Sequence, residues 1–346
     1  MRWHRILHVT GYLLVCVGFC MIFPLAVSGY YKEAGARSFL YAMAVTVIWG
    51  IVMIAAFKPG KGDVLSNREG MAIVAFCWTA AGFFGALPFY LGGAIPSLTD
   101  AVFESVSGFT TTGASVLSNI EGLEKGYLFW RSMIQWLGGM GIIVLSVAIL
   151  PFLGVGGLQL YKAEVPSLTV DKLQPRIRDT AKILWKVYLL FSAIQVVLLK
   201  FGGMSFFDAV CHAFTTMPTG GFSTKNLSLA AYDSAYIDMV VLLFMVMAGI
   251  NFSLHYQMLK GDTLAFWKSS ECRFFLGLVL FLSAVVSFDL YGDVYGSMGR
   301  AFQYGSFQVV SILTTTGFAT ADYESWPALS QLVIFICLFI GASAGS

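Results

Sequence analysis

Charged residues are scarce in this chain of 346 residues: Asp, Glu, Lys and Arg together make up 12% of it, whereas hydrophobic residues make up 58%. Nineteen acidic residues beside 30 phenylalanines leave too little polar surface to cover a water-soluble body of this size. The mean hydropathy of +0.77 agrees with this. The composition therefore excludes a soluble globular protein and predicts an all-α integral membrane protein embedded in a lipid bilayer.

Several kinds of site are also missing. The six cysteines are scattered singly, without a CxxC pair or a His/Cys ligand spacing, so we interpret them as small core residues. His4 and His8 have the spacing of a metal pair, but no third ligand accompanies them. The chain has no HExxH, P-loop or GxSxG sequence, which predicts that it is not an enzyme and has no cofactor. Its basic residues fall in short loops, so no nucleic-acid partner is expected.

The chain contains one short sequence repeat in three copies. Residues 103–113 read FESVSGFTTTG, residues 307–317 read FQVVSILTTTG, and a looser copy over 211–221 reads CHAFTTMPTGG. A further glycine follows each copy by 28 residues, at Gly141, Gly249 and Gly345, inside an apolar segment. Such a repeat predicts one copied unit: an apolar helix, a short amphipathic helix, a Thr/Gly run and a second apolar helix.

The order of apolar segments places these units along the chain, because about 20 apolar residues cross a bilayer. Two spans come first, near 6–27 and 39–57, so residues 1–69 are predicted to be two extra transmembrane helices. The first unit covers 70–152, with spans near 71–91 and 127–150 and a short helix that begins at 97–100 and runs to 108. A cytoplasmic connection and the second unit cover 153–260, with spans near 181–200 and 237–259. The third unit covers 261–346, with spans at 274–290 and from 329 onward and a short helix at 298–313.

The basic residues set the expected orientation. About two-thirds of the 21 lysines and arginines fall on the side of the N-terminus. Since cytoplasmic loops carry the excess of Lys and Arg, the N-terminus is predicted to be cytoplasmic and the Thr/Gly runs to lie near the external mouth.

Non-helical backbone at membrane depth must be buried in protein or line a water-filled path. A ring of Thr/Gly carbonyls can replace the water shell of a monovalent cation, and the C-terminal end of the short helix adds negative potential. The alternative is a buried turn or a helix-packing patch, which three matching copies disfavour. The glycines inside the apolar spans could serve helix packing or gating of the ion path. Asp100 and Asp208 could cap the short helices or attract cations.

One polar position recurs nine residues before the last glycine of each copy. It is occupied by Glu104, His212 and Gln308. We interpret these side chains as a hydrogen-bonded scaffold behind the Thr/Gly runs.

The sequence resembles the TrkH/TrkG/KtrB superfamily of potassium transporters, in its TrkH branch. The resemblance rests on GFTTTGAS (108–115), QWLGGMGIIVLSVAILP (135–151), GGFST (220–224), NFSLHY (251–256) and TTTGFAT (314–320). It implies repeated M1-P-M2 units, as in potassium channels, around a central pore, and potassium uptake across the bacterial inner membrane through a gated selectivity filter. It also implies a homodimer and a cytoplasmic nucleotide-binding regulatory subunit, TrkA. The residues implied to line the ion path are Thr111, Thr112, Gly113, Thr219, Gly220, Gly221, Thr315, Thr316 and Gly317.

The chain departs from the family pattern in one respect, since the family has four units and this sequence shows three. We therefore expect a fourth unit to be absent and the isolated chain to be a fragment that does not conduct selectively. A sodium-coupled or less selective monovalent cation transporter is the alternative function. A membrane enzyme or a packing scaffold is a more distant one.

Overall fold

The computed structural model describes residues 2–58, 67–141 and 177–343. Within these residues every regular element is helical, apart from an isolated bridge between Tyr291 and Tyr295. The α-helices are α1 (Trp3–Cys20), α2 (Ile22–Tyr30), α3 (Ala36–Ala56), α4 (Asn67–Leu91), α5 (Leu98–Phe109), α6 (Lys125–Gly139), α9 (Ile177–Phe201), α10 (Phe206–Thr216), α11 (Ala235–Gly249), α12 (Phe252–Leu259), α13 (Ala265–Lys268), α14 (Ser270–Leu290), α15 (Met298–Leu313) and α16 (Ala328–Cys337). Two 3₁₀ helices, η3 (Ser228–Tyr232) and η4 (Tyr323–Ser325), complete the set.

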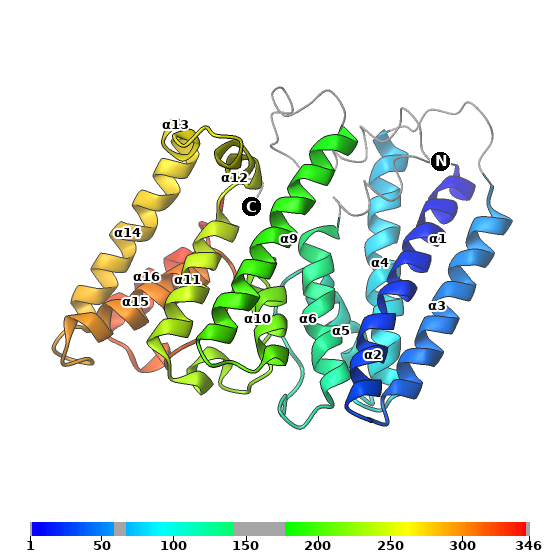
Figure 1. Cartoon of the computed structure of the whole chain (residues 1–346), viewed down its shortest axis with the longest axis horizontal. Coiled ribbons are helices and arrows are strands. Elements are labelled where there is room, and N and C mark those ends of the chain that lie inside the picture. Colours follow the sequence, from blue (N-terminus) through cyan, green and yellow to red (C-terminus); the bar gives the residue numbers. More distant parts are fainter. Residues whose placement is uncertain (1, 59–66, 142–176, 344–346) are drawn as a thin grey trace. The chain divides into compact units, whose positions relative to one another are not determined.

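The chain forms two compact units whose boundary falls inside α9. The first comprises residues 1–110 and 114–185, and the second comprises residues 186–346 together with 111–113. In the first unit α1 packs along α3 and α4, and these helices lie side by side in Figure 1. Gly11 and Gly50 let α1 and α3 approach closely, because a Cβ added to either glycine would lie 2.8 Å from the carbonyl oxygen of the other.

Reciprocal caps join the two extra N-terminal helices to α6. The Glu33 carboxylate accepts hydrogen bonds from the backbone N–H groups of Lys125 (2.7 Å) and Gly126 (3.0 Å), at the start of α6. In return the Glu124 carboxylate accepts from the Gly35 N–H (2.8 Å), at the start of α3. Each helix start thus receives the negative charge and the acceptor that its unpaired N–H groups require. At the other end of α1, Arg2 forms an ion pair of 2.8 Å with Glu69 of α4.

The second unit repeats one arrangement twice. Helices α9, α10 and α11 form one set, and α14, α15 and α16 form the next, with the helix that precedes a Thr/Gly run in the middle of each set (Figure 1). In the second set the last helix, α16, has only ten residues. Helix α15 packs against α14, α11 and α16, so the two sets share one core. The predicted short helix at 298–313 is confirmed residue for residue by α15.

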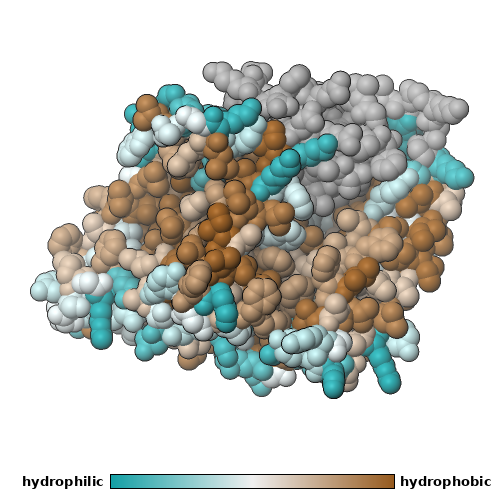
Figure 2. Space-filling view, viewed as in Figure 1, coloured by the Kyte–Doolittle hydropathy of each residue, from teal (hydrophilic) through white to brown (hydrophobic). Residues whose placement is uncertain are grey.

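The outer faces of the long helices are apolar. Five helices in the described parts of the chain are long and apolar enough to cross a membrane, or up to six if the bent pair α11 and α12 is one span. On α14 the exposed side chains of Phe274, Phe281 and Phe288 are spaced by seven residues and therefore lie on one face. Figure 2 shows hydrophobic side chains over the middle of the helices and hydrophilic ones near their ends. This surface suits a lipid environment.

Two predicted spans are wrong in their second halves. The predicted helix over 237–259 is broken, because α11 and α12 meet at an angle of 100° across Ile250 and Asn251. The predicted helix from 329 onward ends at Cys337, and Gly341 adopts a left-handed φ of 72°. The predicted span over 127–150 begins at Lys125, but its part beyond Gly141 lies outside the described residues, as does Gly345.

Candidate functional site

The three Thr/Gly runs share one unusual backbone conformation. In each run a threonine and the glycine two residues later have a left-handed φ, while the residue between them does not. When left-handed and right-handed φ values alternate along a run, successive carbonyl groups point in the same direction, so the carbonyls of one run can all face one side. A left-handed threonine costs about 1–2 kcal/mol, so its recurrence shows that the surroundings impose it. The residues are Thr111, Thr219 and Thr315, with φ of 56°, 54° and 60°, and Gly113, Gly221 and Gly317, with φ of 76°, 74° and 82°.

A short helix leads into each run, and a serine caps the start of each helix. Ser97, Ser205 and Ser297 accept hydrogen bonds from the backbone N–H groups three residues later, at 3.3, 3.0 and 3.3 Å. Asp100 and Asp208 therefore lie in the first turn instead of acting as the N-cap, where their charge suits the helix dipole. The helices α5, α10 and α15 end four or five residues before the last glycine of the run, so their C-terminal carbonyls face it.

In the second and third runs, backbone N–H groups donate back to the short helices. In the third run the N–H groups of Thr316 and Gly317 donate to the Ser311 carbonyl, at 2.8 and 3.2 Å. In the second run Gly220 and Gly221 donate to the carbonyl of Thr215, at 2.9 and 3.2 Å. Because the donors are satisfied behind the run, its carbonyls are the groups left to meet an ion.

Serine hydroxyls fasten the exit of two runs as well. Ser107 donates to the Ala114 carbonyl, and Ser311 to the Phe318 carbonyl, both at 2.6 Å. In each case the acceptor belongs to the residue directly after the last glycine. The shared serine of the repeat thus fixes the chain where it leaves the run.

A buried ion pair braces the first run. The Arg131 Nε of α6 lies 2.7 Å from the Glu104 Oε1 of α5, and their side chains are 1% and 0% exposed. The same carboxylate accepts from the Ser115 hydroxyl at 2.9 and 3.1 Å and from the Val116 N–H at 3.0 Å. Ser115 follows Gly113 by two residues. The carboxylate therefore connects the short helix, the exit of the run and the second long helix.

His212 takes the place of Glu104 in the second unit. Its Nδ1 lies 2.8 Å from the carbonyl oxygen of Asp208, so Nδ1 carries the proton and donates. In the neutral ring Nε2 then accepts from the Ser223 hydroxyl, 3.0 Å away. Ser223 follows Gly221 by two residues, as Ser115 follows Gly113. The predicted scaffold of Glu104 and His212 is confirmed, whereas the Oε1 of Gln308 is buried without a hydrogen-bond partner in the described structure.

The second and third runs lie against each other within the second unit. A Cβ added to Gly221 would overlap the carbonyl oxygen of Thr316. Residues 111–113 of the first run group with this same unit. The nine residues predicted to line the ion path therefore belong to one compact part of the molecule.

Several hydrogen bonds hold the break between α11 and α12. The Asn251 side chain caps α12 by accepting from the Ser253 N–H at 2.9 Å. The His255 Nε2 lies 2.8 Å from the carbonyl oxygen of Met247, which also accepts a hydrogen bond from the Ile250 N–H (3.2 Å) at the end of α11. The Ser343 N–H donates to the Gly249 carbonyl at 3.1 Å, so the segment after α16 rests on the break.

The span glycines serve close packing at two places. A Cβ on Gly138 would overlap the Phe109 carbonyl oxygen at the end of α5. A Cβ on Gly249 would lie 2.8 Å from the Phe275 ring and 3.0 Å from the Thr314 methyl group. Packing is therefore the role that the structure supports for Gly138, while Gly249 combines packing with the helix break.

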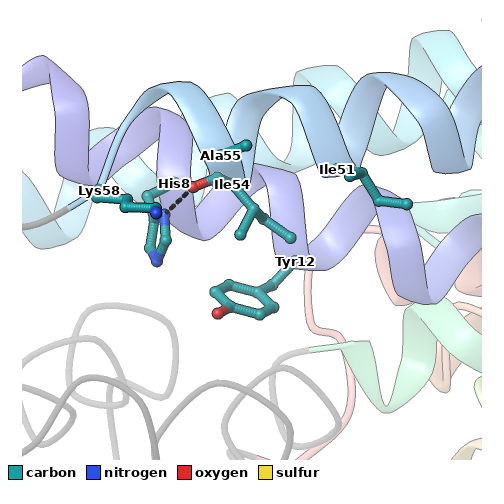
Figure 3. A pocket seen from close by; sticks show the side chains of 6 residues that line it. All are labelled: His8, Tyr12, Ile51, Ile54, Ala55 and Lys58. Carbon is teal, nitrogen blue, oxygen red and sulfur yellow. Dashed lines mark hydrogen bonds between the residues drawn. The ribbon is translucent and has the colours of Figure 1, made fainter.

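His8 belongs to a different site from the Thr/Gly runs. It lines a pocket of about 540 Å³ with Tyr12, Ile51, Ile54, Ala55 and Lys58, between α1 and α3 (Figure 3). Its Nδ1 bonds to the Ile54 carbonyl at 3.1 Å. Over the described ranges no three His, Cys, Asp or Glu side chains come together as metal ligands.

Two functional candidates were missed from the sequence. Arg131 could have been identified from the sequence, because an arginine inside a predicted span needs a buried partner. The role of Ser228 could not be identified from the sequence. Its hydroxyl lies 3.3 Å from the backbone nitrogen of Ala319, and the two residues are 91 positions apart in the chain.

The comparisons with known proteins fit this geometry. Residues 36–346 match the family described as TrkH, cation transport protein. The chain is 41% identical over its whole length to the Trk system potassium uptake protein TrkH of Escherichia coli K12 and covers 72% of it. It is 34% identical to TrkG of the same strain over 98% of this chain and 70% of that protein.

A solved structure agrees in fold. The crystal structure of the potassium transporter TrkH from Vibrio parahaemolyticus matches with a TM-score of 0.87 at 36% identity, over all of this chain and 72% of that one. The predicted fold of repeated M1-P-M2 units preceded by two transmembrane helices is thereby confirmed.

Proposed function

The chain belongs to the TrkH family of cation transport proteins, and we propose that it carries potassium ions across the bacterial inner membrane. The relatives that it matches over its full length are potassium uptake proteins by name. The observation that carries the proposal is the alternating backbone conformation common to the three Thr/Gly runs. A packing patch or a buried turn would not need the same two left-handed positions in three copies.

In this proposal the carbonyls of the runs replace the water shell of the ion. The C-terminal ends of α5, α10 and α15 add a negative potential. Entry is driven by the membrane potential, which contributes about 2.3 kcal/mol per charge for each 100 mV. The residues that line the path are Thr111, Thr112, Gly113, Thr219, Gly220, Gly221, Thr315, Thr316 and Gly317.

The glycines are required for backbone reasons. Gly221 has a left-handed φ of 74°, and its missing side chain leaves room for the Thr316 carbonyl. Glycine adopts this conformation without the strain of a side chain. A residue with a Cβ would push the second and third runs apart.

The finer assignments rest on the family resemblance and the charge pattern. We propose that the N-terminus is cytoplasmic, because most lysines and arginines fall on that side. We also propose a homodimer regulated by the nucleotide-binding subunit TrkA. The unit boundaries of 1–69, 70–152, 153–260 and 261–346 are proposed on the same grounds.

Growth at limiting potassium tests the function. The chain is expressed in bacteria that lack potassium uptake, both by itself and fused to the part of E. coli TrkH beyond the aligned region. We expect the fused form to restore potassium uptake and growth, and we expect Gly113→Ser in the fused form to reduce both. Gly292→Ala is the matched control, because Gly292 also has a left-handed φ (97°) but lies between α14 and α15.

The outcomes separate the alternatives. Uptake of sodium as fast as potassium would support the less selective transporter instead. A failure of both forms to take up potassium, despite normal amounts in the membrane, would overturn the proposal.

A further inference from the structure

The third Thr/Gly run lacks the brace that holds the other two. In the first two units a hydroxyl stands two residues after the last glycine, at Ser115 and Ser223, and Glu104 or His212 holds it. The third unit has Ala319 at this position, which offers no hydroxyl. The residue that should hold it, Gln308, accordingly keeps a buried Oε1 with no partner in the described part of the chain.

Ala319 is held instead by η3, the 3₁₀ helix that follows the second run. The Ala319 N–H donates to the Ser228 Oγ at 3.3 Å. The Ala319 carbonyl accepts from the Ala230 N–H at 3.1 Å. Both backbone groups of Ala319 are thus paired with the segment 228–232, and the exit of the third run is fixed by the neighbouring unit.

The backbone at Ser228 is strained. Its φ is 54°, a left-handed value that disfavours any residue with a side chain. Glycine would adopt this conformation without strain but would provide no hydroxyl. The strained serine directs its hydroxyl at the N–H of Ala319, so the strain coincides with the contact that fixes the third run.

Ring contacts connect the same groups. The His212 ring, which braces the second run, lies 5.4 Å from the Tyr232 ring of η3 and 6.0 Å from the Phe318 ring next to Ala319. The brace of the second run, η3 and the exit of the third run therefore form one packed set. A displacement of η3 would reach both runs.

We propose that Ser228 is a positioning residue for the third run: its hydroxyl fixes Ala319 and thereby the carbonyls of Thr315, Thr316 and Gly317. The second and third runs are then held as a pair, and the selectivity of the third depends on a residue of the second unit. The selectivity part of this proposal rests on the proposed function. The structural part does not, because it concerns the order of the backbone.

Hydrogen–deuterium exchange of the purified chain is the deciding measurement. We expect Ser228→Ala to raise the amide exchange rate of residues 315–319 about fivefold, the effect of losing one hydrogen bond of typical strength. Ser228→Gly should raise it as much, although it relieves the strain and should not lower the thermal stability. Ser325→Ala is the matched control, because it removes the hydroxyl of a serine in the 3₁₀ helix after the third run, whose bond goes to the Asp322 carbonyl.

A rescue variant tests the mechanism further. Ala319→Ser supplies the missing hydroxyl to Gln308, so we expect it to restore slow exchange in the Ser228→Ala background. In transport-competent protein the ratio of potassium to sodium uptake should fall in Ser228→Ala and recover with the rescue.

Unchanged exchange at residues 315–319 in both Ser228 variants would overturn the proposal, whatever the uptake shows. An unchanged ion ratio in protein that exchanges faster would overturn the selectivity part. A failure of both the parent chain and its fused form to take up potassium would refute the proposed function, and the exchange result would still decide the role of Ser228.

Discussion

The buried ion pair behind the first run gives the sharpest test of the scaffold. Glu104→Gln keeps the shape of the side chain but removes its charge, which leaves the Arg131 guanidinium buried at 1% exposure without its counter-ion. Loss of one partner of a buried pair costs roughly 3–5 kcal/mol. We expect a loss of this size because the pair is only 2.7 Å long and Ser115 and Val116 also bond to the lost charge.

The assay is a double-mutant cycle on thermal stability in detergent. Glu104→Gln and Arg131→Gln should each destabilise the protein strongly, while the double variant, which buries no unpaired charge, should lose far less than the sum. Lys268→Gln is the control, because its ion pair with Asp262 is exposed and should contribute less than about 1 kcal/mol. Additive losses in the cycle would refute the view that the two charges act as a unit.

Three further variants test the contact between the second and third runs, the cap of α6 and the break between α11 and α12. Gly221→Ala should abolish potassium uptake, because its Cβ would overlap the Thr316 carbonyl; uptake at the parent rate would contradict the packing of the two runs. Glu33→Ala should lower stability by about 0.5–2 kcal/mol, measured by thermal unfolding, because it uncaps two N–H groups of α6. His255→Phe should lower it by about 0.5–1.5 kcal/mol, because the hydrogen bond from His255 to the Met247 carbonyl is lost while the Ile250 N–H still donates to that oxygen; an unchanged melting temperature would show that the break needs no such bond.

The Thr/Gly runs and the short helices could be predicted because their signals are local. Three copies at fixed offsets identified the runs, residues 97–100 marked the start of α5, and Asp208 marked the start of α10. Helix α15 follows the predicted bounds because Ser297 caps it and the Thr/Gly run ends it. Local capping and turn chemistry decide such boundaries, so sequence alone is enough.

The break between α11 and α12 was missed because hydropathy does not register it. Residues 237–250 are apolar apart from Asp238, and apolar residues alternate with polar ones over 251–259, so the mean hydropathy predicts one continuous span. The overlooked signal is Asn251, an N-cap residue followed two positions later by Ser253, in the middle of that span. The partners that stabilise the break, His255 and Ser343, lie on different elements, and no spacing rule brings them together.

The three units share the backbone conformation of the Thr/Gly run and differ in the side chains that support it. The left-handed positions recur in every run, even though a threonine there is strained, so the conformation itself is the constrained feature. The support behind it varies: a charged pair at Glu104, a neutral ring at His212 and, at Gln308, an amide oxygen with no hydrogen-bond partner in the described part of the chain. Since a run requires only that its backbone is fixed, any contact that fixes the residues after it is sufficient, including a contact from a neighbouring unit. Variants of the supports should therefore be rescued by a different support, whereas variants of the run should not.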